Sequence, residues 1–152
     1  MLTVQVINGR FRLNIHVNPS HAGWSWGVAL NIVLWIAAGL LALAMLGAGI
    51  MKAFRPKAAL RDTMGWVDDF SDNGVKAIGA LEILAAIGLI LPAVLDIAPI
   101  LVPLAATGVV IIMIGAIVVH ARRGERQALP VNVILLLLAA FVAWGRFGPY
   151  SF

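Results

Sequence analysis

Cysteine is absent from this chain of 152 residues, and charged residues make up only 12% of it. Without a thiol, the chain itself forms neither a disulfide nor a dithiol redox centre. An average soluble domain has about a quarter charged residues, so the low charge content argues against a soluble protein. The apolar content agrees, because 62% of the residues are hydrophobic and the mean hydropathy is +0.99. These values are typical of an integral membrane protein.

The sequence also lacks a long polar segment from which a separate soluble domain could form. Its apolar residues fall into four blocks that we expect to be transmembrane spans, at residues 28–54, 75–95, 97–119 and 129–145. A hydrocarbon core about 30 Å thick needs roughly 20 helical residues, so each block can cross it. We therefore predict an all-α membrane protein with an N-terminal extension, residues 1–27, and a four-helix transmembrane bundle, residues 28–152. Little sequence remains for a self-contained catalytic domain, and whether the protein is an enzyme stays open.

Motifs of established chemistry are missing too. No phosphate-binding Gly-rich loop follows a strand, and no Ser/His/Asp arrangement is supported by its spacing. The three histidines do not have the spacing of metal ligands, so we predict no metal site.

Basic residues are concentrated in two of the loops. Eight of the eleven lie between spans one and two or between spans three and four: Lys52, Arg55, Lys57, Arg61, Lys76, Arg122, Arg123 and Arg126. These loops must face the same side of the membrane, and the positive-inside rule makes that side the cytoplasm. We therefore expect both termini outside. Because orientation explains the net charge of +4, we predict no nucleic-acid partner.

The N-terminal extension predicts a short β-hairpin. Residues 4–7 and 10–17 flank Asn8-Gly9, a dipeptide favoured in the type I′ turn, and the second arm alternates apolar and polar residues. An isolated two-stranded hairpin is marginal in water, so it should rest on another surface.

A second short element is predicted between the first two spans. Pro56 can open a helix in which Leu60, Met64 and Val67 recur at helical spacing. The segment is too short to span and carries charges suited to lipid headgroups, so we expect one interfacial amphipathic helix.

Helical spacing also predicts which faces point into the bundle. The predicted inward stripe of span one is Asn31, Trp35, Ala38, Ala42, Met45, Gly49 and Lys52. That of span two is Gly79, Glu82, Ala86, Leu89 and Ala93. The stripes of spans three and four are Ala106, Val109, Met113, Ala116 or Ile117 and His120, and Asn132, Leu135, Ala139, Val142 and Arg146. Small residues on these faces allow close approach of helices.

Glu82 is the most informative single residue, because it lies inside an apolar span. A charge near the centre of a membrane helix costs about 2.5–3.5 kcal/mol on insertion scales, so Glu82 needs a partner. Lys52, His120 and Asn132 lie near the same end of the other spans. We predict that these four residues form a polar cluster at the cytoplasmic end of the bundle, which is the candidate binding site.

Each member of this cluster has a structural and a functional interpretation. Lys52 and Glu82 either form an ion pair that fixes helix register or line a polar pocket for a headgroup or a proton. His120 is either an interface histidine or a proton-handling group, because imidazole titrates near neutral pH. Asn132 is expected to form a hydrogen bond to a neighbouring helix, worth about 0.6 kcal/mol.

Four segments together resemble the DoxX-like family of small four-helix membrane proteins. They are residues 47–57, 78–84, 120–125 and 143–149, and the resemblance extends from residue 28 to the C-terminus. A Gly-x-x-Lys element ends at Lys52 and a Gly-x-x-Glu element ends at Glu82, in the order and the spans of the family. By position these two residues correspond to the recurrent charged pair of the family. The N-terminal extension departs from the short N-terminus of the family.

The resemblance implies an accessory role in the bacterial inner membrane. The family takes its name from a subunit of a thiosulfate:quinone oxidoreductase, and relatives are associated with membrane redox complexes. We therefore expect the bundle to bind a quinone or a lipid headgroup, or to dock a redox partner, near Lys52, Glu82 and His120. The alternative is a structural or assembly protein that packs against another membrane protein, or a second copy of itself, without a small-molecule ligand. A proton-coupled carrier is least favoured, because the chain shows neither inverted repeats nor broken helices.

Overall fold

The computed structural model describes residues 2–7, 10–15 and 20–152, with side chains from residue 26 onward. It consists of two compact units, Met1–Ile32 and Val33–Phe152, which are described one at a time. In the first unit, strand β1 (Leu2–Ile7) pairs antiparallel with β2 (Arg10–Ile15), and Val4 lies opposite Leu13. The Asn8-Gly9 turn lies outside the described residues, as do His16 and Val17, so the type I′ turn stays a prediction.

Four helices are long and apolar enough to cross a membrane. They are α1 (Ser20–Phe54), α3 (Asp72–Val94), α4 (Leu101–Arg123) and α5 (Leu129–Phe147). Helix α1 begins ahead of its predicted span, at Ser20 rather than residue 28, and α4 begins after the expected residue 97. The turn before α4 contains two residues with positive φ, Asp96 at 53° and Ala98 at 50°. Pro99 then disfavours helical backbone at the residue before it, so the helix begins only at Leu101.

The predicted single interfacial helix is wrong in detail, because the segment forms two short pieces. They are α2 (Lys57–Leu60) and the 3₁₀-helix η1 (Gly65–Asp69). Between them the Thr63 hydroxyl donates to the Leu60 carbonyl at 3.2 Å, and Met64 takes an extended φ of −134°. The Leu60 carbonyl also accepts from the Met64 N–H at 2.7 Å, and the helical turn goes no further because Met64 leaves the helical backbone region and Gly65, a poor helix former, follows. The predicted apolar face nevertheless packs, since Leu60 and Val67 are buried with Val75.

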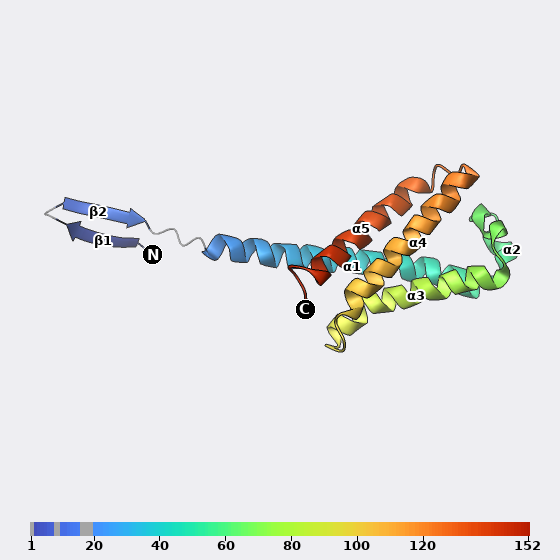
Figure 1. The fold of residues 1–152 in the computed structure, drawn as a ribbon, viewed down its shortest axis with the longest axis horizontal. Helices are drawn as coiled ribbons and strands as arrows, with labels where there is room; N and C mark the ends of the chain where they lie inside the picture. Colours follow the sequence, from blue (N-terminus) through green and yellow to red (C-terminus); the bar gives the residue numbers. More distant parts are fainter. Residues whose placement is uncertain (1, 8–9, 16–19) are drawn as a thin grey trace. The chain divides into compact units, whose positions relative to one another are not determined.

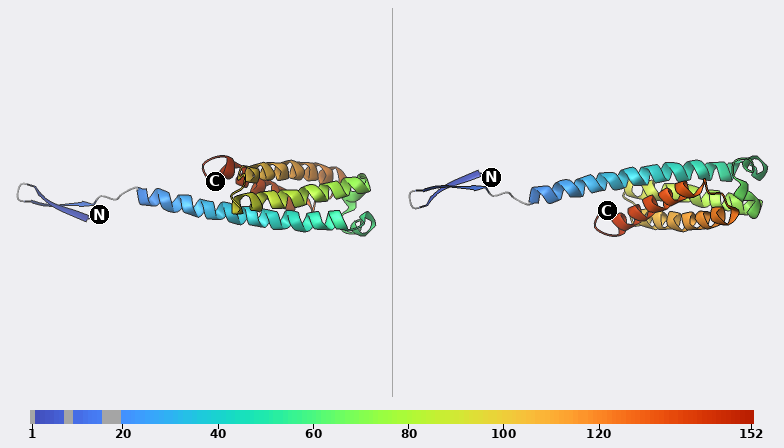
Figure 2. Two further views of the ribbon diagram at one scale, coloured as in Figure 1. Left: turned by 90° about the horizontal axis from the view of Figure 1, so that it is seen from below. Right: turned by 90° about the horizontal axis from the view of Figure 1, so that it is seen from above.

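Within the second unit the four long helices form a closed ring, and glycines mark three of the contacts. A Cβ on Gly49 of α1 would lie 2.7 Å from the Gly79 carbonyl oxygen of α3. One on Gly88 of α3 would lie 2.9 Å from Ala105 Cβ of α4. One on Gly145 of α5 would lie 2.6 Å from Leu34 Cδ2 of α1. Helix α4 also packs along α5, and α2 lies at the opposite end of this unit from the C-terminus (Figures 1 and 2).

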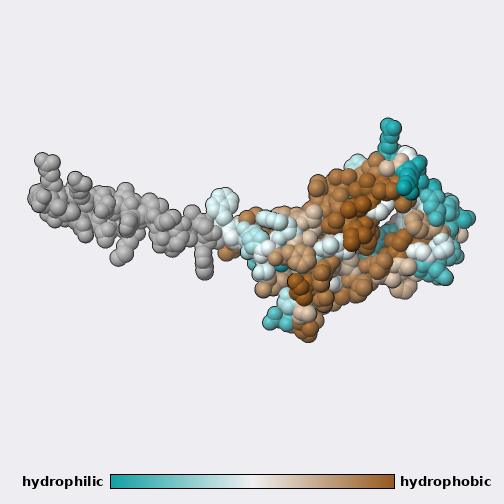
Figure 3. Space-filling view, viewed as in Figure 1, coloured by the Kyte–Doolittle hydropathy of each residue, from teal (hydrophilic) through white to brown (hydrophobic). Residues whose placement is uncertain are grey.

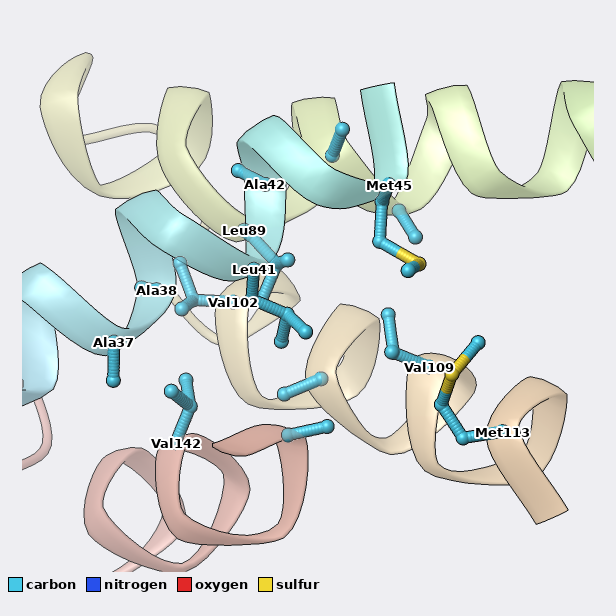
Figure 4. Close-up of a cluster of buried hydrophobic side chains, with 14 residues drawn as sticks. Ala37, Ala38, Leu41, Ala42, Met45, Leu89, Val102, Val109, Met113 and Val142 are labelled. Carbon is cyan, nitrogen blue, oxygen red and sulfur yellow. The ribbon is translucent and has the colours of Figure 1, made fainter. Parts of the chain in front are cut away.

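The core of the bundle contains small and aliphatic side chains from all four long helices (Figure 4). Most of the predicted inward stripes are buried, including Ala38, Ala42, Met45, Gly49, Lys52, Gly79, Glu82, Ala86, Leu89, Ala106, Val109, Met113, Ala139, Val142 and Arg146. Trp35 is half-buried, and Asn31 is exposed at the start of its stripe. Small side chains at these positions let the helices approach closely, which is how membrane bundles gain packing energy.

The outer face is apolar, as Figure 3 shows by its brown colour over the helices. Large side chains such as Leu43 and Ile111 are 70% and 66% exposed. A surface of this kind is unfavourable in water and favourable in lipid. The teal, hydrophilic residues gather mainly at the end that carries α2.

At the other end of the bundle, Arg146 is accommodated by aromatic rings and backbone. It is only 4% exposed, and its Nη1 donates to the Tyr150 carbonyl oxygen at 2.9 Å. Its guanidinium carbon lies 4.1 Å from the Phe152 ring centroid and 5.3 Å from that of Trp35. These are cation–π distances, so this basic residue is part of the packing at the C-terminal end.

Candidate functional site: a polar cluster beside a cleft

Lys52 and Glu82 meet inside the bundle. The Lys52 ammonium donates to both carboxylate oxygens of Glu82, at 2.6 Å to Oε1 and 2.7 Å to Oε2. Lys52 is 8% and Glu82 2% exposed, so the pair is buried. Removing either partner would leave an uncompensated charge in a low-dielectric environment, which is strongly unfavourable.

The glycines one turn earlier explain how the two helices bring this pair together. A Cβ on Gly79 would lie 2.8 Å from the Gly49 carbonyl oxygen and 2.9 Å from Lys52 Cβ. Because the two backbones are in contact at this crossing, the Lys52 and Glu82 side chains can reach each other across the helix interface. The Gly-x-x-Lys and Gly-x-x-Glu elements therefore act together, because the glycines allow the close approach at which the two charged side chains meet.

His120 is oriented by the end of its own helix. Gly124 follows α4 with φ 72°, and its N–H donates to the Ala121 carbonyl while that of Glu125 donates to the His120 carbonyl. This is a Schellman C-cap, which needs the left-handed backbone that glycine adopts without strain. The reversal brings Glu125 Oε2 to 2.6 Å from His120 Nδ1. In the tautomer that donates from Nδ1 to this carboxylate, Nε2 is left as an acceptor.

Sequence reasoning missed Glu125, Arg123 and Asp69, and the last two extend the His120–Glu125 pair into a network. Arg123 Nε donates to Glu125 Oε1, and Arg123 Nη1 donates to Asp69 Oδ1, both at 2.7 Å. The network joins the end of α4 to η1. Hydrogen bonds from Arg123 and then His120 hold the pKa of the Glu125 carboxyl below its ordinary value of 4.5. The C-cap glycine beside Glu125 was the sequence signal that could have revealed the His120 contact.

Asn132 lies beside the cluster and makes a different contact from the one predicted. Its Nδ2 donates to the Ala128 carbonyl, four residues earlier, at 3.1 Å. The bond is therefore local to the start of α5 and does not reach a neighbouring helix. An asparagine near a helix start readily bonds local backbone, and here this leaves its Oδ1 acceptor available.

A cleft of about 290 Å³ connects the four predicted residues. Its lining includes Lys52, Glu82, His120 and Asn132, and the rest is mostly apolar: Trp66, Phe70, Ile78, Leu81, Ile112, Met113, Gly115, Ala116 and Val119. Helices α3 and α4, which both line the cleft, meet at their connecting turn and diverge toward the α2 end (Figure 1). Figure 3 shows a hollow among the brown residues next to the teal end.

A second cavity of about 760 Å³ adjoins the cleft on the polar side. The two share Lys52, Trp66, His120 and Asn132, and the second is otherwise lined by residues 63–65, residues 124–128 and Val131. A molecule in this space would therefore meet an apolar passage between helices and then a polar chamber.

Hydrogen-bonding capacity remains inside the cleft after the internal bonds are counted. An ammonium has three N–H donors, and Lys52 uses two of them on Glu82. The His120 Nε2 has no hydrogen bond within the described part of the chain. The site thus offers a cationic donor from Lys52 and an imidazole nitrogen from His120 on opposite helices. Among the described residues, no group of three or more His, Asp or Glu is placed to hold a metal ion.

The fold and the site together define a multi-pass membrane protein with a buried charged pair at one end of a four-helix bundle. The chain belongs to the DoxX-like family, whose sequence model matches residues 36–142. No curated protein and no solved structure matches it.

Proposed function

We propose that the protein binds the headgroup of a membrane-soluble quinone between α3 and α4, as an accessory subunit of a membrane redox system. The cleft supports this proposal most directly, because an apolar passage between two membrane helices ends on the Lys52–Glu82 pair and His120. Ligand pockets commonly measure about 300–1,000 Å³, so the 290 Å³ cleft suits a single-ring headgroup.

The residual hydrogen-bonding groups match both redox states of such a ligand. The third N–H of Lys52 can donate to a quinone carbonyl oxygen, and the His120 Nε2 can accept from a quinol hydroxyl. The Glu82 carboxylate neutralises Lys52 and keeps its position, so the site presents directional donors with little net charge. Such a site suits a neutral ring better than a charged lipid headgroup. A buried charged headgroup would need a counter-charge that the site does not offer. The redox partner is expected to dock at the polar end formed by α2, η1 and residues 124–128.

Two glycines on α4 provide a matched test. A Cβ at Gly115 or Gly108 meets nothing within 4 Å, but only Gly115 lines the cleft. We expect a short-chain quinone to raise the melting temperature of the wild type and of Gly108→Leu, because a ligand that binds only the folded state stabilises it. Gly115→Leu should fold equally well and lose this shift. No shift in the wild type, at concentrations where the quinone is soluble, would overturn the proposal.

A second candidate, a structural or assembly protein without a small-molecule ligand, is favoured by the closed geometry of the Lys52–Glu82 pair. Its expected consequences differ. Glu82→Gln would lower the melting temperature by the same amount with and without quinone, and His120→Ala would have no effect. Under the quinone proposal, His120→Ala weakens the quinone-dependent shift while the melting temperature without ligand stays nearly the same.

The proposed location is the bacterial inner membrane, with both termini outside. The support for this orientation is the concentration of basic residues at the α2 end, which the positive-inside rule assigns to the cytoplasm. The redox partner would then approach from the cytoplasmic side.

A further inference from the structure

A separate hollow of about 110 Å³ lies where α1 ends and α3 begins. Its lining contains the basic residues Arg55, Lys57 and Lys76 together with Lys52, Pro56, Asp72 and Val75. Apart from Lys52 it shares no residue with the quinone cleft. It therefore offers a site on the α1–α3 side of the bundle that the proposed function does not use.

The charges around this hollow are unbalanced. Lys52 is neutralised by Glu82, and the remaining three cations face one carboxylate, that of Asp72. Arg55 and Lys76 are exposed and form no ion pair among the described residues. Lys57 is fixed by a 2.6 Å hydrogen bond from its ammonium to the Phe70 carbonyl, which leaves further N–H donors. Like charges gathered around a hollow repel one another unless an anion occupies it.

The position of the hollow indicates the source of such an anion. Arg55 follows the last residue of a membrane-spanning helix, and Lys76 lies in the first turns of the next. Both therefore lie at headgroup depth, where clusters of Lys and Arg bind anionic lipids. Phe54 and Ile50 lie one helical turn apart on α1 just before Arg55 and are 78% and 45% exposed. They provide an apolar surface that an acyl chain can follow from the hollow into the bilayer.

We propose that this hollow binds the phosphate of an anionic phospholipid through Arg55, Lys57 and Lys76, with an acyl chain along Phe54 and Ile50. A zwitterionic lipid has the same phosphate but adds a cation that three basic side chains would repel. The inference goes beyond quinone binding and does not depend on it, because the two sites share only Lys52 and one takes a neutral ring whereas the other takes an anion.

Native mass spectrometry of the full chain in detergent with defined lipids tests the proposal. The probes are phosphatidylglycerol, which is anionic, and phosphatidylcholine, which is zwitterionic. We expect the wild type to retain phosphatidylglycerol preferentially, and Arg55→Gln and Lys76→Gln each to weaken its binding about fivefold, the effect of one basic residue at a membrane surface. Arg122→Gln is the matched control, since Arg122 is exposed at the same end but does not line the hollow.

Three results would overturn the proposal. Equal retention of both lipids by the wild type would mean that the basic residues of the hollow do not distinguish an anionic lipid from a zwitterionic one. An equal loss in Arg122→Gln would mean that only the total charge matters. Displacement of the lipid by millimolar inorganic phosphate would mean that the hollow takes a free anion rather than a lipid, whereas resistance to phosphate supports the lipid. Melting temperatures of all variants confirm that each is folded.

Discussion

Gly49 and Gly79 touch through their backbones, because a methyl group on Gly49 would lie 2.7 Å from the Gly79 carbonyl oxygen. One turn further along the same two helices, Lys52 and Glu82 form the buried ion pair. The first contact brings α1 and α3 close together, and the second joins them through a buried charged pair. The cleft that we propose as the binding site ends on this pair.

We expect Gly49→Ala to destabilise the protein by about 1–3 kcal/mol, the usual cost of overpacking a tight contact. Gly47→Ala is the control, because Gly47 lies on the same helix and a Cβ there would meet nothing within 4 Å. Its effect should stay within about 1 kcal/mol and favour stability, since alanine is the better helix former. Reversible unfolding in mixed detergent micelles measures both. Equal destabilisation by the two substitutions would show that the α1–α3 crossing is not tight.

Lys52 and Glu82 should be energetically coupled. Glu82→Gln in the wild type leaves a buried ammonium without its counter-ion and should cost about 3–5 kcal/mol. The same substitution in a Lys52→Met background removes no ion pair and should cost much less. A double-mutant cycle on the free energy of unfolding gives the coupling. Effects that add within about 0.5 kcal/mol would contradict a bonded pair.

The Glu125 network predicts a pH dependence of stability. The folded-state pKa of Glu125 lies below its ordinary value of 4.5, so its carboxylate stabilises the fold above that value. The contribution disappears as the pH falls through the lowered pKa. We therefore expect Glu125→Gln to have a lower melting temperature than the wild type at neutral pH, and the difference to vanish in strong acid. A difference that persists or grows in acid would contradict the hydrogen bonds that Glu125 accepts from Arg123 and His120.

Orientation can be measured by cysteine labelling, because the chain contains no cysteine. Ser151 lies at the C-terminal end and Gln127 in the α4–α5 loop, and both are exposed. In intact cells, a membrane-impermeant maleimide should label Ser151→Cys and leave Gln127→Cys unlabelled until the membrane is opened. Labelling of position 127 alone from outside would reverse the proposed topology.

Much of the fold could be predicted from apolar runs, since four spans and their inward stripes follow from hydrophobic length and spacing. The start of α4 and the division of the interfacial segment depend instead on local backbone conformation. Residues 97–100 are largely apolar, but the positive φ of Ala98 and the following Pro99 delay the start of α4. The interfacial segment was likewise divided at Met64, whose backbone leaves the helical region, which a count of apolar residues does not detect.

The site was predictable where a physical necessity applied. A buried carboxylate needs a partner, and Lys52 was the basic residue at the right depth. The His120–Glu125 contact depends on the left-handed Gly124 cap, which sequence can suggest but not fix. The contact of Arg123 with Asp69 joins residues 54 apart in the chain and depends on how η1 packs against α4. The cleft itself is lined by both α3 and α4, and how these helices pack is a property that no local pattern contains.

The central claim is that the cleft between α3 and α4 holds a quinone headgroup, and the most direct test is native mass spectrometry of protein purified from membranes in mild detergent. We predict that the wild type and Gly108→Leu carry a releasable ligand with the mass of an isoprenoid quinone, and that Gly115→Leu does not. Lys76→Gln should keep this ligand while losing anionic phospholipid, which separates the two proposed sites. Wild-type protein without a quinone, or equal quinone retention by Gly115→Leu, would contradict the assignment of the cleft.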